Sequence, residues 1–297
     1  MRNVLLLSLI LILLGCQKEI SKGQSKTIKT EGYELIISDK QKGLLILFPG
    51  GGGNSENIKK EFKIVEKAKQ HGISLVMINF SRKLWIEDED CKNLSIQIKN
   101  IIKTHRLSTD NIYLGGMSIG GNVTLTLSQY LLKNKLLEIK GAFVIDPPLD
   151  LFGLYESSIK DLKREDFSEE QLTEPKWIVQ FFEDNFSKDT LFNNIQKVSP
   201  FTSRTKYFDN ISELKNIKLR FYTEPDIEWW KDVRNTEFES SNAFYIRKLN
   251  ETLRTEKWNK SEFIETQNRG YRSNGERNPH SWSIVDRSKL IEWILKP

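Results

Sequence analysis

The feature that most constrains the fold is an alternation of short, continuous apolar runs with segments of helical periodicity. GLLILF at 43–48, ISLVMINF at 73–80 and GAFVID at 141–146 are runs of this kind. Runs this short and this apolar are typical of strands that are buried on both faces of a parallel sheet. Helical segments separate them, and the order strand, helix, strand predicts parallel strands joined by crossover helices.

The same reading extends along most of the chain. We expect strands at 33–38, 43–48, 73–80, 111–116, 141–146, 217–223 and 261–267, and helices at 55–70, 91–106, 122–134 and 286–296. Residues 147 to about 215 break this rhythm, because they are helical in period, rich in aromatic residues and too long for a plain connection. The sequence therefore predicts an α/β fold with a doubly wound, mostly parallel sheet. A helical cap covers its edge over about 147–215, and Pro175 starts one of the cap helices.

The N-terminus has the pattern of an export signal. Arg2 precedes an apolar run over 4–14, which is shorter than the roughly 20 residues that a membrane-spanning helix needs. The run ends in LLGC, which resembles the lipobox of bacterial lipoproteins, where the cysteine receives lipid after cleavage. A simple secretory peptide and an uncleaved anchor are the alternatives. The resemblance implies a signal peptide over 1–15, a lipid on Cys16, a polar tether over 16–31 and a folded domain over 32–297.

A lipid anchor of this kind predicts a protein that is attached to a membrane and lies outside the cytoplasm. The net charge of +5, from 45 basic and 40 acidic residues, is too mild to indicate nucleic-acid binding. Cys91 is the only other cysteine, so no disulfide is expected within the chain once Cys16 carries lipid. Cys91 lies among acids that should raise its thiol pKa, and it is not predicted to be a nucleophile.

The segment GMSIG at 116–120 fits the pattern G-x-S-x-G between a predicted strand and a predicted helix. In that context the serine occupies a strained turn at the end of the strand, so Ser118 is the predicted nucleophile. The segment FPGGGG at 48–53 lacks the lysine and serine of a phosphate-binding loop, and resembles the HGGG-type loop of esterases and lipases. That resemblance implies an oxyanion hole made by the backbone N–H groups of Gly51, preferred over Gly52, and Ile119.

A serine hydroxyl needs a neighbouring base, and the chain has three histidines. His71 and His105 precede predicted strands and are expected at the wrong edge of the sheet. His280, in NPHSW, follows the last predicted strand and is the predicted base.

The base needs an acid that orients it. Asp226, which follows the predicted strand at 217–223, is the first choice, with Glu224 second. Asp146, directly after the strand predicted at 141–146, is a further candidate. Three tryptophans lie close to these positions in the sequence, and core packing is expected of each, with a substrate platform as the alternative: Trp229, Trp230 and Trp282.

Together these motifs resemble the α/β-hydrolase family over most of 33–297, with its chain order of serine, acid and histidine. The chain departs from the family at Thr223, where a glycine usually precedes the acid loop, and in the missing histidine of the oxyanion loop. The resemblance implies a serine hydrolase that cleaves a small-molecule carboxylic ester or another acyl substrate through an acyl-enzyme, with neither metal nor organic cofactor. A peptidase or amidase of the same fold, or a ligand-binding lipoprotein without catalysis, are the alternatives.

Overall fold

The computed structural model describes residues 26–80 and 83–296. The predicted signal peptide, Cys16 and most of the predicted tether lie outside the described residues. The end of that tether belongs to the fold, because Lys26–Lys29 form strand β1 and pair antiparallel with β2, Tyr33–Ile37. The sequence does not predict this strand, because β1 is an exposed edge strand in which only Ile28 packs against the core.

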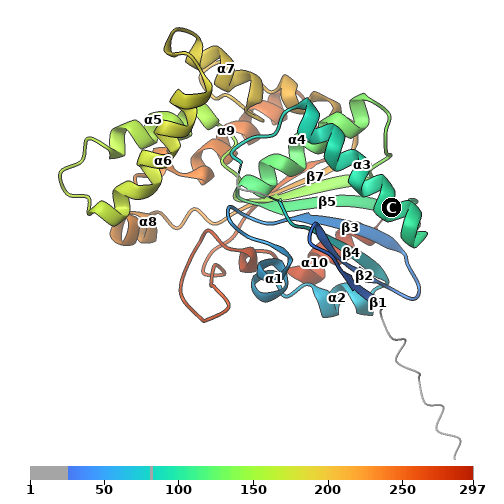
Figure 1. Cartoon of the computed structure of the whole chain (residues 1–297). Helices are drawn as coiled ribbons and strands as arrows, with labels where there is room; N and C mark the ends of the chain where they lie inside the picture. Colours follow the sequence, from blue (N-terminus) through green and yellow to red (C-terminus); the bar gives the residue numbers. More distant parts are fainter. Residues whose placement is uncertain (1–25, 81–82, 297) are drawn as a thin grey trace, which may run out of the picture.

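Eight strands form one sheet in the order β1-β2-β4-β3-β5-β6-β7-β8 (Figure 1). From β4 through β8 every neighbouring pair is parallel, which confirms the prediction of a mostly parallel sheet. Each predicted strand exists, with its ends within two residues of the prediction. The parallel strands are β3 (Gly43–Phe48), β4 (Ile73–Ile78), β5 (Ile112–Met117), β6 (Gly141–Ile145), β7 (Lys218–Thr223) and β8 (Ser261–Glu265).

Helices cover both faces of the sheet, as a doubly wound fold requires (Figure 1). One face carries α2 (Val65–Gln70) and α10 (Arg287–Leu295), which share an apolar core with β3, β4 and β5. The other face carries α3 (Asp88–His105), α4 (Ile119–Lys133) and α9 (Asn242–Thr255). Helix α9 was not predicted from the sequence.

The single helix predicted over 55–70 is interrupted. It divides into α1 (Ser55–Asn57), a π-helical turn (Ile58–Phe62) and α2, and Lys63 between the last two has a left-handed φ of 51°. In an unbroken helix, Ile64 and Phe62 would lie about 200° apart around the axis. Both side chains are buried in the same core, so the break at Lys63 is what turns the two of them inward.

The segment predicted as a cap carries three α-helices: α5 (Leu151–Asp161), α6 (Glu169–Asn185) and α7 (Leu191–Val198). Their apolar cluster includes Ile119, so these helices lie beside the turn that carries Ser118 (Figure 1). The expectation that Pro175 starts a helix is wrong. Helix α6 begins at Glu169, because Ser168 and Gln171 form a capping box, and Pro175 is buried inside the helix.

Candidate active site

Ser118 occupies the sharp turn between β5 and α4. Its φ of 55° and ψ of −129° lie outside the regions that a non-glycine residue ordinarily adopts, so the turn stores strain at this one residue. The Ser118 N–H donates to the Ile145 carbonyl oxygen at 2.8 Å, which ties the turn to the end of β6. A half-buried hydroxyl is therefore held at the carboxyl edge of the sheet.

The glycines around Ser118 are required by close backbone approaches. A Cβ on Gly116 would lie 2.1 Å from the Gly120 carbonyl oxygen, and one on Gly120 would lie 2.2 Å from the Pro49 carbonyl oxygen. These distances are far too short for any side chain. The serine turn and the glycine loop after β3 are thus packed directly against each other.

The glycine loop after β3 lies beside the turn that carries Ser118. The Gly53 N–H donates to the Gly50 carbonyl at 3.0 Å, and Gly52 has the left-handed φ of 74° that this turn needs. A Cβ on Gly50 would lie 3.6 Å from the Ser118 Cβ, so Gly50 is close to the nucleophile and joins Gly51 as a candidate oxyanion donor. On the other side, Ile119 is the first residue of α4, and no capping side chain accepts a hydrogen bond from this helix end.

His280 is paired with Asp146. Its Nδ1 lies 2.6 Å from Asp146 Oδ2, and the side chains are 28% and 5% exposed. Asp146 follows β6 directly and has a left-handed φ of 46°, which aims its carboxylate along the carboxyl edge of the sheet. The backbone N–H of His280 donates to Asn278 Oδ1 at 2.9 Å, and this hydrogen bond orders the backbone that carries the ring. The candidate base and its acid therefore come from the segment before α10 and from the end of β6.

Asp226, the acid preferred from the sequence, does not meet His280. One of its oxygens accepts a hydrogen bond from the Trp229 N–H at 3.3 Å and caps α8 (Ile227–Arg234), and the other is paired with Arg277. Because the Arg277 guanidinium holds Asp226, this carboxylate is oriented towards the cation and not towards the imidazole. Arg277 stands three residues before His280 in the sequence. A cation at this position indicates that a nearby acid, here Asp226, can pair with arginine and not with the histidine.

Glu224, the second choice from the sequence, is also occupied. Its side chain is fully buried and lies 2.6 Å from Arg277. It also accepts hydrogen bonds from Thr266 Oγ1 at 2.8 Å and from the Gly270 N–H at 3.0 Å. Glu224 therefore anchors the chain segment that leads to His280.

Asp146 has a second set of partners that sequence reasoning missed. The Thr223 hydroxyl donates to Asp146 Oδ1 at 2.6 Å, and the Asn242 side chain donates to the Asp146 carbonyl oxygen at 2.9 Å. Each carboxylate oxygen is thus engaged, one by Thr223 and the other by His280. Thr223 stands where the family usually has a glycine, and its hydroxyl positions the Asp146 carboxylate.

The remaining histidines lie elsewhere. His71 Nδ1 is 2.9 Å from the Lys67 carbonyl oxygen at the end of α2, and His105 Nε2 is 3.2 Å from the Tyr33 hydroxyl. Both residues precede the strands β4 and β5, and so stand at the amino edge of the sheet. Neither has a place beside Ser118.

The three tryptophans divide into two kinds. Trp282 is buried and stacks on Phe62 with ring centroids 4.6 Å apart, so it is part of the core. Trp229 and Trp230 are half-buried on α8 and contact each other edge to face at 5.1 Å. The expectation of core packing is therefore confirmed for Trp282 alone among the three tryptophans.

No group of three or more metal-binding side chains is found within residues 26–80 and 83–296. Cys91 is buried in α3, and burial together with Asp88 and Asp90 raises the pKa of its thiol to about 12. A thiol with such a pKa is protonated at neutral pH and is a poor nucleophile.

Comparison with known proteins points to the fold. No protein-family model and no curated protein sequence matches the chain. Among solved structures, a fluorophosphonate-binding serine hydrolase of Staphylococcus aureus matches with a TM-score of 0.53 and 13% identity, over 92% of this chain and 98% of that one. An arylesterase matches at 0.55 and 15%, over 92% and 85%. A hormone-sensitive lipase from a metagenome library matches at 0.56 and 16%, over 91% and 84%. At these identities the likeness shows the fold, which is the α/β-hydrolase fold.

Proposed function

We propose that this protein is a serine hydrolase that cleaves a carboxylic ester, with Ser118 as nucleophile, His280 as base and Asp146 as the orienting acid. The observation that carries the proposal is the hydrogen bond of 2.6 Å between His280 Nδ1 and Asp146 Oδ2, at the edge where the strained turn presents Ser118. An Nδ1–H that donates to a carboxylate leaves Nε2 free to accept a proton. That is the state in which an imidazole activates a serine hydroxyl.

The chemistry follows the serine-hydrolase sequence of steps. Ser118 Oγ attacks the ester carbonyl carbon while His280 Nε2 takes the hydroxyl proton, and the Asp146 carboxylate stabilises the imidazolium that forms. The tetrahedral intermediate collapses, the alcohol leaves with the proton from His280, and an acyl group remains on Ser118. Water, deprotonated by His280, then attacks the acyl carbon. The second tetrahedral intermediate collapses and releases the acid, and His280 returns the proton to Ser118 Oγ.

The oxyanion hole in this proposal uses the Ile119 N–H and one N–H of the glycine loop, from Gly51 or Gly50. The support for Ile119 is that its N–H begins α4 with no capping side chain, so it can donate to a developing charge. The positive end of the α4 dipole adds to this stabilisation.

The wall beside the nucleophile favours a substrate with hydrocarbon surface. Ile119 shares an apolar cluster with the cap helices, in which the Trp85 ring stacks on Phe182 and Phe186 with centroids 5.5 and 5.0 Å away. An apolar wall with a few polar groups at the reacting atoms is the usual composition of a small-molecule site.

The test is labelling of the full chain by a fluorophosphonate probe. We expect wild type to label, and both Ser118→Ala and His280→Gln to lose labelling. Ser128→Ala is the matched control, because it removes a hydroxyl from α4, ten residues after Ser118, and it should label like wild type. Labelling that survives in Ser118→Ala would overturn Ser118 as the nucleophile. A folded wild type that never labels would overturn the hydrolase proposal and favour a ligand-binding lipoprotein.

We also propose that Cys16 carries a lipid and holds the protein on a membrane outside the cytoplasm. The support is the apolar run that ends in LLGC. Growth of a bacterial host with a palmitate analogue should label wild type and Cys91→Ser, and Cys16→Ser should lose both the label and the membrane fraction. Equal labelling of Cys16→Ser would contradict the anchor without touching the hydrolase proposal.

A further inference from the structure

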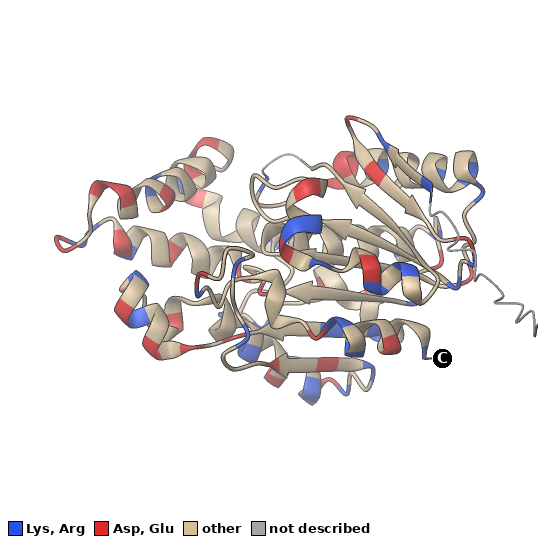
Figure 2. Cartoon of the chain, turned by 90° about the horizontal axis from the view of Figure 1, so that it is seen from below, with Lys and Arg blue, Asp and Glu red and all other residues tan. Residues whose placement is uncertain are grey.

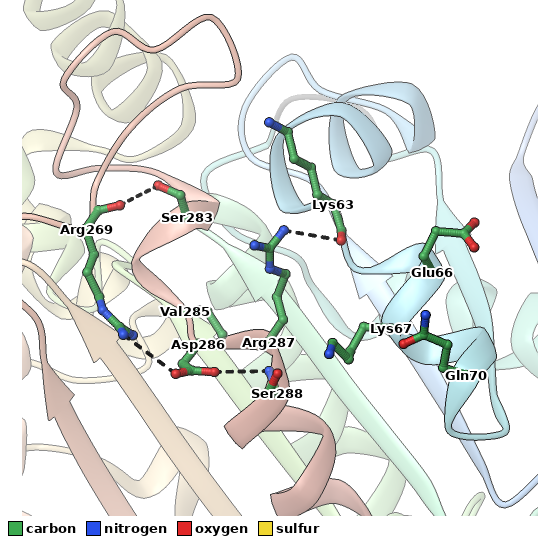
Figure 3. Close-up of a pocket in the computed structure, with 10 residues that line it drawn as sticks. All are labelled: Lys63, Glu66, Lys67, Gln70, Arg269, Ser283, Val285, Asp286, Arg287 and Ser288. Carbon is green, nitrogen blue, oxygen red and sulfur yellow. Dashed lines mark hydrogen bonds and ion pairs between the residues drawn. The ribbon is translucent and has the colours of Figure 1, made fainter.

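A pocket of about 570 Å³ lies between α2 and the start of α10, and we name it the α2–α10 pocket (Figure 3). Its walls come from α2 and from Lys63 just before that helix, from the segment before α10, and from the first turn of α10. None of the residues of the candidate active site lines it. The lining is Lys63, Glu66, Lys67, Gln70, Arg269, Ser283, Val285, Asp286, Arg287 and Ser288.

Three cations of the pocket have no acidic partner among residues 26–80 and 83–296. Lys63, Lys67 and Arg287 form no ion pair there, whereas Arg269 in the same lining is paired with Asp286. The Arg287 guanidinium donates to the Lys63 carbonyl oxygen at 3.4 Å, which holds it at the centre of the pocket. Figure 3 shows the Lys67 ammonium beside Arg287, in the gap between α2 and α10, and the Lys63 ammonium on the opposite side of the guanidinium.

The two acids that line the pocket are engaged elsewhere. Glu66 is 3.2 Å from Lys69, and in Figure 3 its carboxylate points away from Arg287. Asp286 caps α10 by accepting from the N–H groups of Ser288 and Lys289 at 3.1 Å each, and those hydrogen bonds lower its pKa. Asp286 also lies 3.6 Å from Arg269 on the far wall. The negative charge of Asp286 therefore offsets the charge of Arg269 and the positive end of the α10 dipole. It does not neutralise Lys63, Lys67 and Arg287.

Neutral donors complete the lining. In the part of the chain that the structure describes, the side chains of Gln70 and Ser288 have no hydrogen-bond partner, and both line the pocket. A concave site with excess positive charge concentrates anions. Lysine and arginine bind phosphate oxygens by charge-assisted hydrogen bonds, and several convergent donors suit the several oxygens of a tetrahedral anion.

We propose that the α2–α10 pocket is a binding site for a phosphate group, held by Lys67 and Arg287. The group comes either from a free phosphate compound or from the headgroup of a membrane phospholipid, and both present the same oxygens to these cations. The site is separate from the hydrolase proposal, because it needs neither Ser118 nor His280.

Calorimetric titration of the detergent-solubilised full chain tests this, with the ionic strength held constant by chloride. One arm uses inorganic phosphate and the other uses glycerophosphoglycerol, a phospholipid headgroup that carries no carboxylic ester to hydrolyse. Saturable binding of either probe supports the site. Tighter binding of inorganic phosphate assigns a free compound, and tighter binding of glycerophosphoglycerol assigns a lipid. If neither probe binds saturably, the proposal is overturned.

The variants locate the binding. Lys67→Gln and Arg287→Gln should each weaken it about tenfold, as expected for one lost charge-assisted hydrogen bond. Lys60→Gln and Lys289→Gln remove the same charge from the π-helical turn before α2 and from α10, outside the pocket, and should bind like wild type. Equal weakening in all four variants would mean that diffuse surface charge attracts the anion, and it would overturn the site.

Discussion

The loops after β6 and β7 present carboxylates at the same edge of the sheet, yet the structure uses them differently. After β6, Asp146 accepts from Thr223 on one oxygen and pairs with His280 on the other. After β7, Glu224 and Asp226 both pair with Arg277. The strands are parallel neighbours, so both loops lie at the carboxyl edge of the sheet, where such folds bind their ligands, with β6 directly beside β5 and β7 one strand further away. The basic side chain that each carboxylate meets distinguishes their roles: an imidazole for Asp146 and a guanidinium for Glu224 and Asp226.

The two loops nevertheless act on one segment. The acid after β6 holds the His280 ring, and the acids after β7 hold the backbone and the arginine that precede it. We infer that the first acid controls the rate of reaction and that the second pair controls the stability of the segment. Four substitutions test this division of roles between the loop after β6 and the loop after β7, and they follow in order of decreasing expected effect. Other charged residues are spread over the whole molecule, as Figure 2 shows.

Asp146→Asn should have the largest effect. An amide can no longer fix the Nδ1–H tautomer or stabilise the imidazolium, so kcat/KM for a short-chain p-nitrophenyl ester should fall about 10⁴-fold. The measurement is steady-state hydrolysis at neutral pH, with circular dichroism to show that the variant folds. A folded variant within tenfold of wild type would refute Asp146 as the acid.

Glu224→Gln should mainly reduce stability. It leaves Arg277 without the fully buried half of its pair, which costs about 3 kcal/mol of the free energy of unfolding. Urea denaturation measures this. The control is Glu265→Gln on β8, whose pair with Arg247 is about 40% exposed on both sides and should contribute less than about 1 kcal/mol. Equal losses in the two variants would show that burial of Glu224 is not what matters.

Thr223→Val should lower kcat about tenfold with KM unchanged. The substitution keeps the shape and removes a hydrogen bond of 2.6 Å to a charged oxygen, which stabilises by about 1.5 kcal/mol or more. Thr223→Ser retains the hydroxyl and should stay close to wild type. A Thr223→Ser variant as slow as Thr223→Val would mean that packing, and not the hydrogen bond, is responsible.

Asp226→Asn should have the smallest effect. Asparagine still caps α8, and the pair with Arg277 is partly exposed on both sides, at 24% and 20%. We expect kcat/KM within about threefold of wild type and a loss of stability below about 1 kcal/mol. A loss of activity comparable to that of Asp146→Asn would show that the loop after β7, and not the loop after β6, supplies the acid for His280.

The fold was predictable because its strands are continuous apolar runs and its crossover helices have clear periodicity. The exceptions have physical causes, as at β1, where an exposed edge needs few apolar residues, and at Ile64, where the core requires a helix break. In the candidate site, the positions of Ser118 and His280 followed from local patterns. The choice among Asp146, Glu224 and Asp226 did not, since it depends on contacts between segments more than a hundred residues apart, such as Asp146 with His280.

The pairing of His280 with Asp146 is the central claim, and the Nδ1 proton of His280 reports it directly. With only three histidines, proton NMR of the full chain with ¹⁵N-labelled histidine can follow that single proton, assigned by its loss in His280→Gln. We predict a strongly downfield resonance that persists in Asp226→Asn and is lost in Asp146→Asn. A resonance that persists in Asp146→Asn and is lost in Asp226→Asn would contradict the account.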